Sequence, residues 1–422
     1  MTKVRFIHTS DLHLDTPFRG LLNRNPQHAL KQKEATVQSF VRIIDLCIEN
    51  QVDFLVIAGD VFDSENKSVA SQRRFAVELQ RLKNHRIKVF LVCGNHDPLS
   101  EWLTANTLPD NVHRFGSSRI ERIPFERDGV GVADIYGTSF ENKVVKENLS
   151  LKYEIGDHPL PISIAVLHGT IGAAGPHETY APFKLNDIAG KGFDYWALGH
   201  IHRRQVISAA GPAVVYSGNT QGRDFGEMGQ KGCYLVEISA GSNPELTFLP
   251  TQLIRFEEVE VDLSGEDDFG RLSSIGNELV ESVTDHDESV DYVFRVVLKG
   301  RTSLHAHLNR PGELQALLED LNADQTGGDR SCWIDRLELR TTPEIDLDGL
   351  RKGADFLGEI LRALDKTAAD RNAQETLLAA LSDDFKNAAA RREFLELTER
   401  DTESLFVDAQ QRLLDQLAGD GR

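Results

Sequence analysis

The sequence predicts a layered α/β protein, followed by a small α+β unit and a helical C-terminal region. Short apolar runs recur through the first 240 residues, and continuous runs of this kind suit strands buried on both faces. They are Val4–Ile7, Phe54–Ile57, Val89–Val92, Ile162–Leu167, Tyr195–Leu198, Val214–Tyr216 and Cys233–Val236. Helical patterns separate them, at Val37, Val41, Ile44 and Ile48 and at Phe75, Leu79 and Leu82. Strands that alternate with helices indicate a layered α/β domain, which we assign to residues 1–253.

The pattern changes after about Arg255. Strands at Phe256–Val261, Tyr292–Leu298 and Cys332–Leu339 alternate with helices around Leu272–Val283 and Gly312–Leu321. This order predicts a small α+β domain over residues 254–343. After Pro343 the apolar residues repeat at helical spacing, which predicts a helical region over residues 344–422. The repeating positions are Leu350, Phe356, Leu357, Ile360, Leu361, Leu364, Leu377, Leu378, Leu381, Leu405, Leu413 and Leu417.

The composition is that of an ordinary globular protein, with 422 residues, 40% hydrophobic and 27% charged. No apolar signal-peptide core precedes the first strand, and the best apolar run, Ile162–Leu167, is far too short to span a bilayer. The four cysteines form neither a CxxC pair nor a disulfide framework. These features predict a reduced, cytoplasmic protein that does not enter the membrane.

The negative charge is concentrated in the second part of the chain. Residues 1–250 hold 27 Lys and Arg against 28 Asp and Glu, whereas residues 251–422 hold 20 against 38, so the net charges are −1 and −18. An acidic region repels nucleic acid through its long-range field, so contact with a polyanion is expected from the first part. The acidic part is either a docking surface for a partner or a solvated surface that aids solubility.

Five polar motifs each follow one of the predicted strands. They are Asp11-Leu12-His13, then Gly59-Asp60 with Asp63 beyond it, Gly94-Asn95-His96-Asp97, His168-Gly169 and Gly199-His200-Ile201-His202. In open α/β sheets, ligands bind beyond the carboxyl ends of the strands, so we expect these residues to converge on one site. Asp11 and His13 are two residues apart, as are His200 and His202, and in extended backbone such residues point to the same side.

The side chains in these motifs are those of a metal site. Carboxylate, amide oxygen and imidazole together suit a divalent ion such as Mn²⁺, and the lack of cysteine in the set disfavours a structural zinc site. Seven candidate ligands are too many for one ion with open positions, so two ions that share a carboxylate fit better. Two ions about 3.5–4 Å apart hold a phosphoryl group and generate hydroxide. Among the other residues, His96 suits acid–base work because a histidine pKa lies near neutrality.

In identity and order, the five motifs resemble the calcineurin-like metallophosphoesterase superfamily. Within it, Thr9-Ser10-Asp11-Leu12-His13-Leu14 and Gly59-Asp60-Val61-Phe62-Asp63 are similar to the SbcD branch of DNA repair exonucleases, and most of all to its YhaO-like members. The catalytic part of the resemblance covers about half of the chain. It implies a layered β-sandwich metallophosphoesterase domain flanked by helices, with the α+β domain capping the active site.

The resemblance also implies a role for each residue of the motifs. Asp11, His13 and His202 would hold the first metal, Asp60 would bridge the two metals, and Asn95, His168 and His200 would hold the second. His96 would protonate the leaving oxygen or stabilise the transition state, Asp63 and Asp97 would orient ligands, and Arg203, Arg204 and Arg223 would contact phosphate. His177 and Tyr180 are further candidates for substrate contact, with a solvated loop as the alternative.

The leading hypothesis is a Mn²⁺-dependent nuclease that acts on DNA ends or single strands in DNA repair. Members of the family work with an SbcC-like ATPase of the SMC type, and residues 344–422 have apolar spacing suited to docking on it. The alternative is that these helices pack on the protein's own core, and a homodimer is a further arrangement to consider. Two other functions remain open: hydrolysis of a small phosphodiester, nucleotide or phosphoprotein, and a non-enzymatic scaffold for an ATPase. The complete ligand set and His96 argue against a scaffold.

Overall fold

The computed structural model describes residues 2–14, 16, 26–63, 69–102, 108–172, 179–283, 287, 289–324, 332–344, 347–354, 356–374 and 376. The chain divides into two compact units. The first comprises Met1–Val259, Leu279–Arg295 and Asp324–Arg336, and the second comprises Glu260–Glu278, Val296–Ala323 and Leu337–Arg422. In the part of the chain that the structure describes, no helix is both long and apolar enough to cross a membrane.

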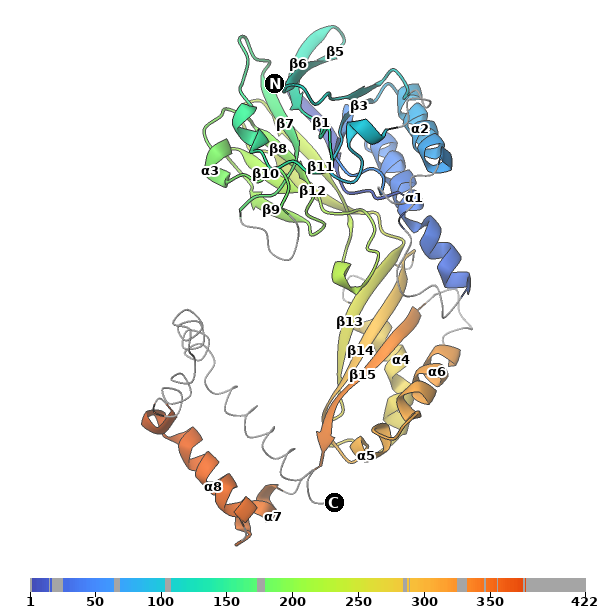
Figure 1. Ribbon diagram of the computed structural model, residues 1–422. Helices are drawn as coiled ribbons and strands as arrows, with labels where there is room; N and C mark the ends of the chain where they lie inside the picture. Colours follow the sequence, from blue (N-terminus) through green and yellow to red (C-terminus); the bar gives the residue numbers. More distant parts are fainter. Residues whose placement is uncertain are drawn as a thin grey trace. The chain divides into compact units, whose positions relative to one another are not determined.

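The first unit contains a six-stranded sheet in the order β12-β11-β1-β2-β3-β4 (Figure 1). The strands are β1 (Lys3–Thr9), β2 (Phe54–Ala58), β3 (Lys88–Val92), β4 (Val112–Arg114), β11 (Gly232–Ser239) and β12 (Glu245–Pro250). β1 to β4 pair in parallel, whereas β11 pairs antiparallel with both β1 and β12. The carboxyl ends of β1, β2 and β3 therefore lie at one edge of this sheet.

A second six-stranded sheet has the order β5-β6-β7-β8-β10-β9. Its strands are β5 (Glu121–Arg127), β6 (Val130–Gly137), β7 (Ile162–His168), β8 (Tyr195–Gly199), β9 (Gln205–Ser208) and β10 (Ala213–Tyr216). β6, β7, β8 and β10 are parallel, and β5 and β9 are antiparallel strands at the two edges. In register, His168 at the end of β7 pairs with Gly199 at the end of β8.

Alternating side chains of the strands divide the core into layers. On β2, Phe54, Val56 and Ala58 pack between the two sheets, while Leu55 and Ile57 face helices α1 (Pro26–Glu49) and α2 (Val69–Asn84). The second sheet repeats this arrangement, because residues of β7 and β8 contribute both to the core between the sheets and to a cluster with α3 (Leu185–Ile188). Figure 1 shows α1 and α2 beside the first sheet and α3 beside the second. The predicted layered β-sandwich flanked by helices is confirmed.

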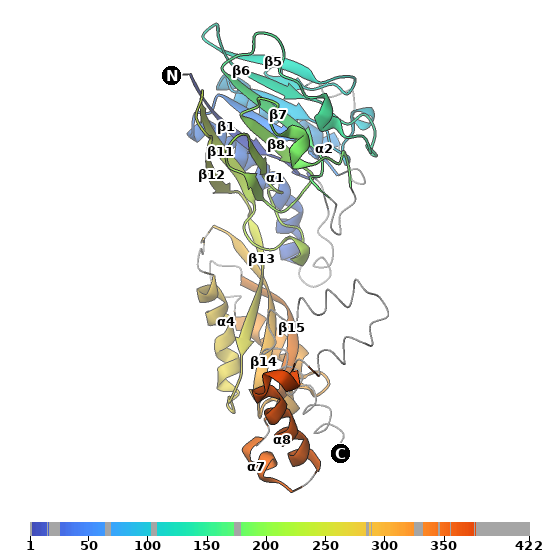
Figure 2. The same ribbon diagram turned by 90° about the vertical axis from the view of Figure 1, so that its left-hand side faces the viewer.

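The chain after β12 forms a three-stranded sheet in the order β13-β14-β15, with helices beside it (Figure 2). Its elements are β13 (Ile254–Asp262), α4 (Gly270–Ser282), β14 (Asp291–Thr302), α5 (His305–Leu308), α6 (Glu313–Asp324) and β15 (Cys332–Pro343). The order of three strands and two main helices matches the α+β pattern predicted from the sequence.

Two helices follow, α7 (Leu347–Lys352) and α8 (Phe356–Ala369). They are joined to each other by Arg351, whose Nε donates to Asp365 Oδ2 at 2.8 Å, and by Arg362, whose Nη1 donates to the carbonyl of Gly353 at 2.8 Å. The helical pattern predicted around Leu350 and Leu361 is therefore present. The predicted helical positions Leu377, Leu378, Leu381, Leu405, Leu413 and Leu417 lie outside the described residues.

Candidate metal centre

The polar motifs meet where parallel strands of both sheets end. β1, β2 and β3 end at Thr9, Ala58 and Val92, and β7 and β8 end at His168 and Gly199. The two sheets touch at this edge, because His168 Nδ1 lies 2.9 Å from the carbonyl oxygen of Ala58. The five motifs therefore surround one locus, as the carboxyl-end rule predicts.

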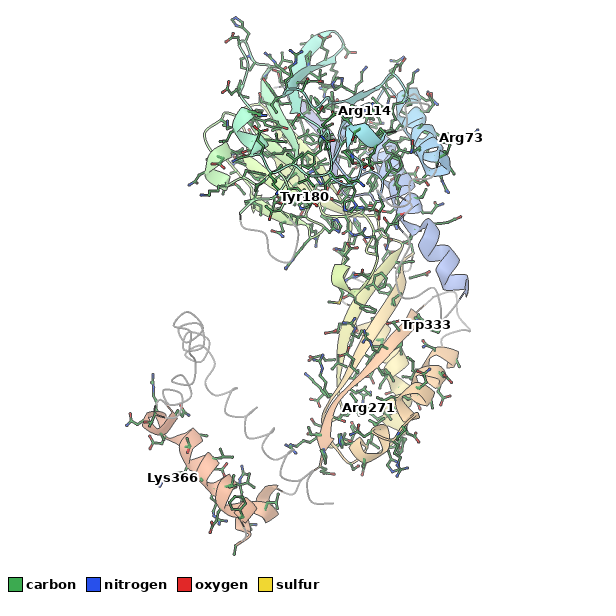
Figure 3. All side chains as sticks on the ribbon, viewed as in Figure 1. Arg73, Arg114, Tyr180, Arg271, Trp333 and Lys366 are labelled. Carbon is green, nitrogen blue, oxygen red and sulfur yellow. The ribbon has the colours of Figure 1, made fainter. Side chains whose placement is uncertain are left out.

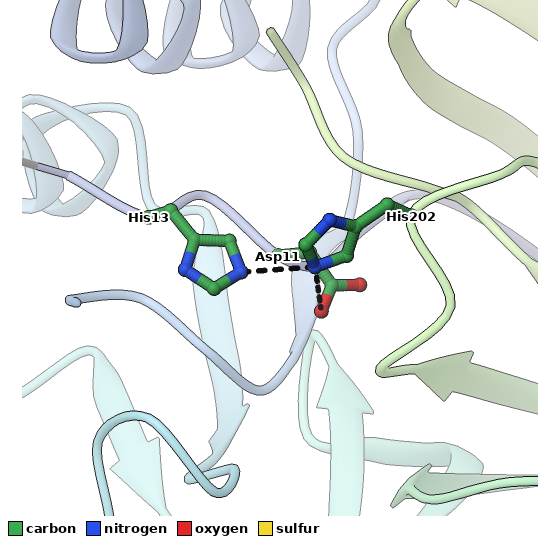
Figure 4. A group of neighbouring side chains, drawn as sticks. All are labelled: Asp11, His13 and His202. Atoms are coloured by element: carbon green, nitrogen blue, oxygen red, sulfur yellow. Dashed lines mark hydrogen bonds and ion pairs between the residues drawn. The ribbon is translucent and has the colours of Figure 1, made fainter. Parts of the chain in front are cut away.

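Three side chains form one group of candidate ligands. Asp11, His13 and His202 each place one ligand atom within 4.8 Å of the others. His13 Nε2 is 3.1 Å from His202 Nε2, and His202 Nε2 is 3.9 Å from Asp11 Oδ1 (Figure 4). Asp11 and His13 come from the segment after β1 and His202 from the segment after β8, so residues far apart in the chain converge here.

A second group consists of Asp60, His168 and His200, which satisfy the same 4.8 Å limit. His168 Nε2 lies 3.4 Å from Asp60 Oδ2 and 3.0 Å from Asn95 Oδ1. The structure thus brings together the seven residues that the sequence suggests as ligands, and a third group, His13, Asp60 and His96, also meets the 4.8 Å limit.

Asp60 faces both groups. Its Oδ2 lies 3.8 Å from His13 Nε2 and 3.4 Å from His168 Nε2. This oxygen is buried, and within the described part of the chain it has no hydrogen-bond partner, whereas Oδ1 accepts from the backbone N–H of His96 at 2.9 Å. A buried carboxylate oxygen without a donor is costly unless a cation is bound to it. The donor set of carboxylate, amide and imidazole, with this unpartnered oxygen at its centre, fits two divalent ions.

The electrostatics of this locus favour positive charge. Burial alone lowers the pKa of His168, but the carboxylates of Asp60 and Asp11 outweigh burial and raise it to about 9. Burial raises the pKa of Asp60, yet the neighbouring imidazoles of His168 and His13 hold it well below its usual range. His13 behaves differently, because burial and the nearby cation of Arg223 lower its pKa. Asp60 therefore stays ionised and His13 stays neutral, the forms in which both side chains bind metal.

Partners behind the ligands fix the orientation of two imidazole rings. Since the carbonyl of Ala58 accepts from His168 Nδ1, Nε2 is the nitrogen left to face Asp60 and Asn95. His202 Nδ1 lies 2.6 Å from Glu227 Oε1, which leaves Nε2 to face Asp11 and His13. Glu227 was not among the residues suggested by the sequence, because it follows His202 by 25 positions and belongs to no motif.

Four of the candidate ligands adopt left-handed backbone. The φ angles are 51° at Asp11, 43° at His13, 53° at Asp60 and 94° at His200. The extended backbone expected for the Asp11/His13 and His200/His202 pairs is therefore wrong at Asp11, His13 and His200. Asp11 and His13 still share one group of candidate ligands, whereas His200 and His202 belong to different groups. Non-glycine residues with positive φ are uncommon and concentrate at functional sites, where surrounding structure holds them in place.

Glycines let the motifs approach one another closely. A Cβ atom on Gly199 would lie 1.9 Å from the carbonyl oxygen of Ala58, a backbone atom that cannot move aside. A Cβ atom on Gly94 would lie 2.2 Å from Asp60 Oδ1. Both contacts are far inside van der Waals distance, so only glycine allows the ends of β2, β3 and β8 to meet.

His96 and Asp63 form a pair next to His13. The His96 ring is 4.8 Å from the His13 ring between centroids, and its Nδ1 is 3.5 Å from Asp63 Oδ1. The His96 side chain is 37% exposed, compared with 1% for His13. Burial lowers the pKa of His96, but the Asp63 and Asp60 carboxylates reverse this and raise it above its ordinary value. The site therefore includes one accessible imidazole that tends to carry a proton.

Asp97 lies behind the ligands and joins two of the motifs. It is fully buried, and its carboxylate accepts from the backbone N–H of Val61 at 3.0 Å and of Gly94 at 2.8 Å. Burial and the Asp60 carboxylate raise the pKa of Asp97 to about 7, against the effect of these two donors. Asp97 thus ties the turn that carries Asp60 to the turn that carries Asn95.

The three arginines differ in their surroundings. Arg203 is exposed, and Arg204 is exposed with its guanidinium carbon 3.8 Å from the centroid of the Phe248 ring. Arg223 is largely buried and binds Glu227 through Nε at 3.1 Å and Nη2 at 2.6 Å. Its guanidinium thus forms an ion pair with the carboxylate of Glu227, which lies beside His202.

Tyr180 and His177 were the two loop residues suggested for substrate contact, and Tyr180 lies beside the candidate metal centre. Tyr180, labelled in Figure 3, has its ring 5.4 Å from the ring of His200 between centroids. His177 lies outside the described residues.

Comparison with known proteins defines the class to which this fold and site belong. Residues 4–204 match the family described as calcineurin-like phosphoesterase, and residues 256–342 match the middle domain of metallophosphoesterase YhaO. The chain belongs to the calcineurin-like metallophosphoesterases, and it is a metal-dependent phosphoester hydrolase.

Individual relatives narrow this class further. An uncharacterized metallophosphoesterase YhaO of Bacillus subtilis is 35% identical over 368 residues, which cover 87% of this chain and 88% of that protein. The DNA double-strand break repair protein Mre11 of Sulfurisphaera tokodaii is 28% identical over 216 residues, covering 51% and 53% of the two chains. The SbcD component of the SbcCD nuclease of Bacillus subtilis is 22% identical over 271 residues, covering 56% and 67%. The chain is thus homologous to YhaO along most of its length and to Mre11 and SbcD nucleases over about half of it.

Proposed function

We propose that this protein is a phosphodiesterase that uses two Mn²⁺ ions to cleave DNA at ends or in single strands. One observation carries the two-ion assignment: Asp60 Oδ2, which is buried and unpartnered among the described residues, lies between His13 Nε2 and His168 Nε2. A carboxylate in that position is suited to bridging two cations. Mn²⁺ is proposed over Mg²⁺ because the set mixes imidazole with oxygen ligands, whereas Mg²⁺ prefers oxygen and keeps its waters.

The candidate ligands would divide between the two ions. Asp11, His13 and His202 would hold one ion, and Asn95, His168 and His200 the other, with Asp60 shared. Bound there, the ions would supply Lewis acidity and a hydroxide nucleophile near neutral pH. Glu227, Ala58 and Asp97 would hold the surrounding imidazoles and turns in place before substrate arrives.

His96 would act on the leaving group. Its imidazole lies beside His13 and is partly exposed, and the Asp63 carboxylate at 3.5 Å favours its protonated form. A proton held on that ring would pass to the leaving oxygen as the phosphoester bond breaks, a contribution typically worth about 10²–10⁴ in rate. Asp63 would orient the ring, and it is itself held by Thr16, whose Oγ1 donates to Asp63 Oδ2 at 3.0 Å.

The substrate is proposed to be DNA for two reasons. Two of the relatives are a DNA double-strand break repair protein, Mre11, and a subunit of a nuclease, SbcD. In addition, Arg203 and Arg204 directly follow the candidate ligand His202 and are exposed, so they supply cations for a phosphate backbone although residues 1–250 are nearly neutral. By the same homology, an SbcC-like ATPase of the SMC type is the proposed partner, docked on the helices after Pro343.

The proposal is tested with the purified full-length protein on linear duplex DNA, single-stranded DNA and bis-p-nitrophenyl phosphate. We expect hydrolysis of DNA and of the small diester with Mn²⁺, much slower hydrolysis with Mg²⁺, and none after exhaustive chelation. Asp60→Asn serves as the inactive control, because Asn tolerates left-handed backbone but removes the shared charge.

Three outcomes would count against the proposal in different ways. Activity that survives exhaustive chelation would refute the metal mechanism. Hydrolysis of the small diester without cleavage of either DNA would favour a small phosphodiester as substrate. Stoichiometric Mn²⁺ binding with no hydrolysis of any of the three substrates would favour a scaffold.

A further inference from the structure

Glu227 occupies a special position behind the metal centre. It ends the short helix η3 (Phe225–Glu227), and its side chain is 11% exposed. Its Oε1 lies 2.6 Å from His202 Nδ1. Its Oε2 accepts from Asn219 Nδ2 at 2.9 Å and from the backbone N–H and Nε of Arg223 at 2.9 and 3.1 Å. Glu227 is therefore fixed from several sides and presents one oxygen to His202.

His202 Nδ1 has two competing neighbours. Arg223 Nη2 is 3.0 Å away and is only a donor, whereas the Glu227 carboxylate at 2.6 Å is only an acceptor. If Arg223 were the hydrogen-bond partner, Nδ1 would bear the lone pair and Nε2 would bear the proton. If Glu227 is the partner, Nδ1 bears the proton and Nε2 presents its lone pair to Asp11 and His13. The shorter distance favours Glu227.

The same segment also holds the backbone of His202. The carbonyl of His202 accepts from the backbone N–H of Asn219 at 3.1 Å and from Lys231 Nζ at 3.4 Å. A Cβ atom on Gly218 would lie 2.8 Å from that carbonyl oxygen, so the segment passes very close to it. Residues 217–231 thus restrain His202 in two ways. Asn219 and Lys231 hold its main chain, and Glu227 holds its ring.

We propose that Glu227 is a positioning residue that selects the His202 tautomer with the proton on Nδ1, and that Arg223 acts on the centre through Glu227 instead of contacting phosphate. This inference rests on the proposed role of His202 as a metal ligand. A carboxylate that accepts the second N–H of a ligating imidazole orients the ring and increases its basicity, and losing such a partner typically weakens metal binding about 10–100-fold.

The structure supplies a matched control for the test. His113 and Glu121 form a second histidine–glutamate pair, with Nε2 2.9 Å from Oε2, and Glu121 Oε1 also accepts from a backbone N–H, that of Gly116, at 3.0 Å. Neither residue belongs to the groups of candidate ligands. Glu121→Gln therefore removes the same charge from the same kind of pair outside the centre.

The experiment measures Mn²⁺ affinity by titration calorimetry for the full-length protein and for Glu227→Gln, Arg223→Gln and Glu121→Gln. We expect Glu227→Gln to weaken binding about 10–100-fold and Glu121→Gln to leave it unchanged. Arg223→Gln should weaken binding less than Glu227→Gln, because the carboxylate remains. A rise in KM for DNA with unchanged Mn²⁺ affinity in Arg223→Gln would instead assign that arginine to phosphate.

A second measurement reads the ring of the unaltered protein directly and uses a variant only to assign the signal. Long-range ¹⁵N–¹H correlation on the metal-free full-length protein with labelled histidine reports the tautomer of the His202 ring, assigned by His202→Gln. We expect the proton on Nδ1. A proton on Nε2, or equal Mn²⁺ affinity for Glu227→Gln and the unaltered protein, would overturn the inference while leaving the proposed function intact. Absence of Mn²⁺ binding by the unaltered protein would refute the proposed function itself.

Discussion

Asp63 lies 3.5 Å from His96, Oδ1 to Nδ1, and is the nearest described side chain that favours a proton on that imidazole. Burial acts in the opposite direction, so the pKa of His96 results from a balance between the two. Removing the Asp63 charge should disturb that balance without touching any of the seven candidate ligands.

We predict that Asp63→Asn moves the alkaline limb of the pH–rate profile to lower pH. The sign follows from the proposed role, because a general acid is active when protonated and activity falls as pH rises through its pKa. Without the Asp63 charge, burial dominates and the pKa of His96 falls. The measurement is kcat on bis-p-nitrophenyl phosphate across pH at saturating Mn²⁺. Asp110→Asn, which removes an exposed carboxylate paired with Lys83, is the control, and an unchanged limb in Asp63→Asn would contradict the prediction.

We predict that His96→Gln and Asp60→Asn separate catalysis from metal binding. His96→Gln should keep both ions and lose about 10²–10⁴ in turnover, as expected for a general acid. Asp60→Asn should lose metal and activity together, because its Oδ2 faces both groups of ligands. Elemental analysis and turnover are measured on each variant, with Asp134→Asn as a control for a buried carboxylate outside the centre. Equal loss of metal from His96→Gln and Asp60→Asn would make His96 a ligand.

We predict that Gly199→Ala destabilises the fold and weakens metal binding together. The added methyl would meet the carbonyl oxygen of Ala58, so the ends of β8 and β2 must separate, and His200 moves with them. Overpacking of this kind costs about 1–3 kcal/mol. Urea unfolding measures the loss in the free energy of unfolding. Gly270→Ala is the control, since a methyl there meets only the side chain of Asp268, at 3.1 Å, and equal stability of the two variants would refute the contact argument.

We predict that the helices after Pro343 are dispensable for chemistry and required for partner binding. A chain that ends after Glu344 keeps β15 and every candidate ligand, so it should still hydrolyse bis-p-nitrophenyl phosphate. It should fail to retain a coiled-coil ATPase that the full chain retains. Residues 251–422 carry a net charge of −18, so that retention should weaken as added salt shortens the Debye length from about 10 Å at 0.1 M to about 3 Å at 1 M. An insoluble or inactive truncated chain would show instead that the tail packs on the core.

The sequence was sufficient to predict strands that are buried on both faces, such as β2 and β8, because their apolar runs are continuous. It was less informative for strands whose apolar runs are interrupted by charged residues, proline or glycine, such as β5 and β6. The β5–β6 hairpin was not predicted, although Asp128 and Gly129 form its turn with φ of 54° and 79°. Asp-Gly between two strands is a strong hairpin signal, so this strand pair was predictable in principle.

In the candidate site, the ligands could be predicted from the sequence, but the residue that supports His202 and the backbone conformation could not. Ligands such as Asp60 and His168 lie in short motifs after strands, so local sequence identifies them. Glu227 was missed because its contact with His202 exists only after residues 203–226 have folded back. The left-handed backbone at Asp11 and His13 was missed because spacing along the chain does not report φ.

The left-handed turns at the ligands also mean that the metal-binding motifs are not portable. Each such residue costs about 1–3 kcal/mol and persists only where its surroundings impose it. At Asp11 the backbone N–H donates to Gly59 O at 3.0 Å, and at His13 it donates to Asp60 O at 3.1 Å, so each half of the site shapes the other. A peptide copy of residues 9–14, or the same motif grafted onto another sheet, would relax to ordinary backbone and aim its carboxylate and imidazole apart.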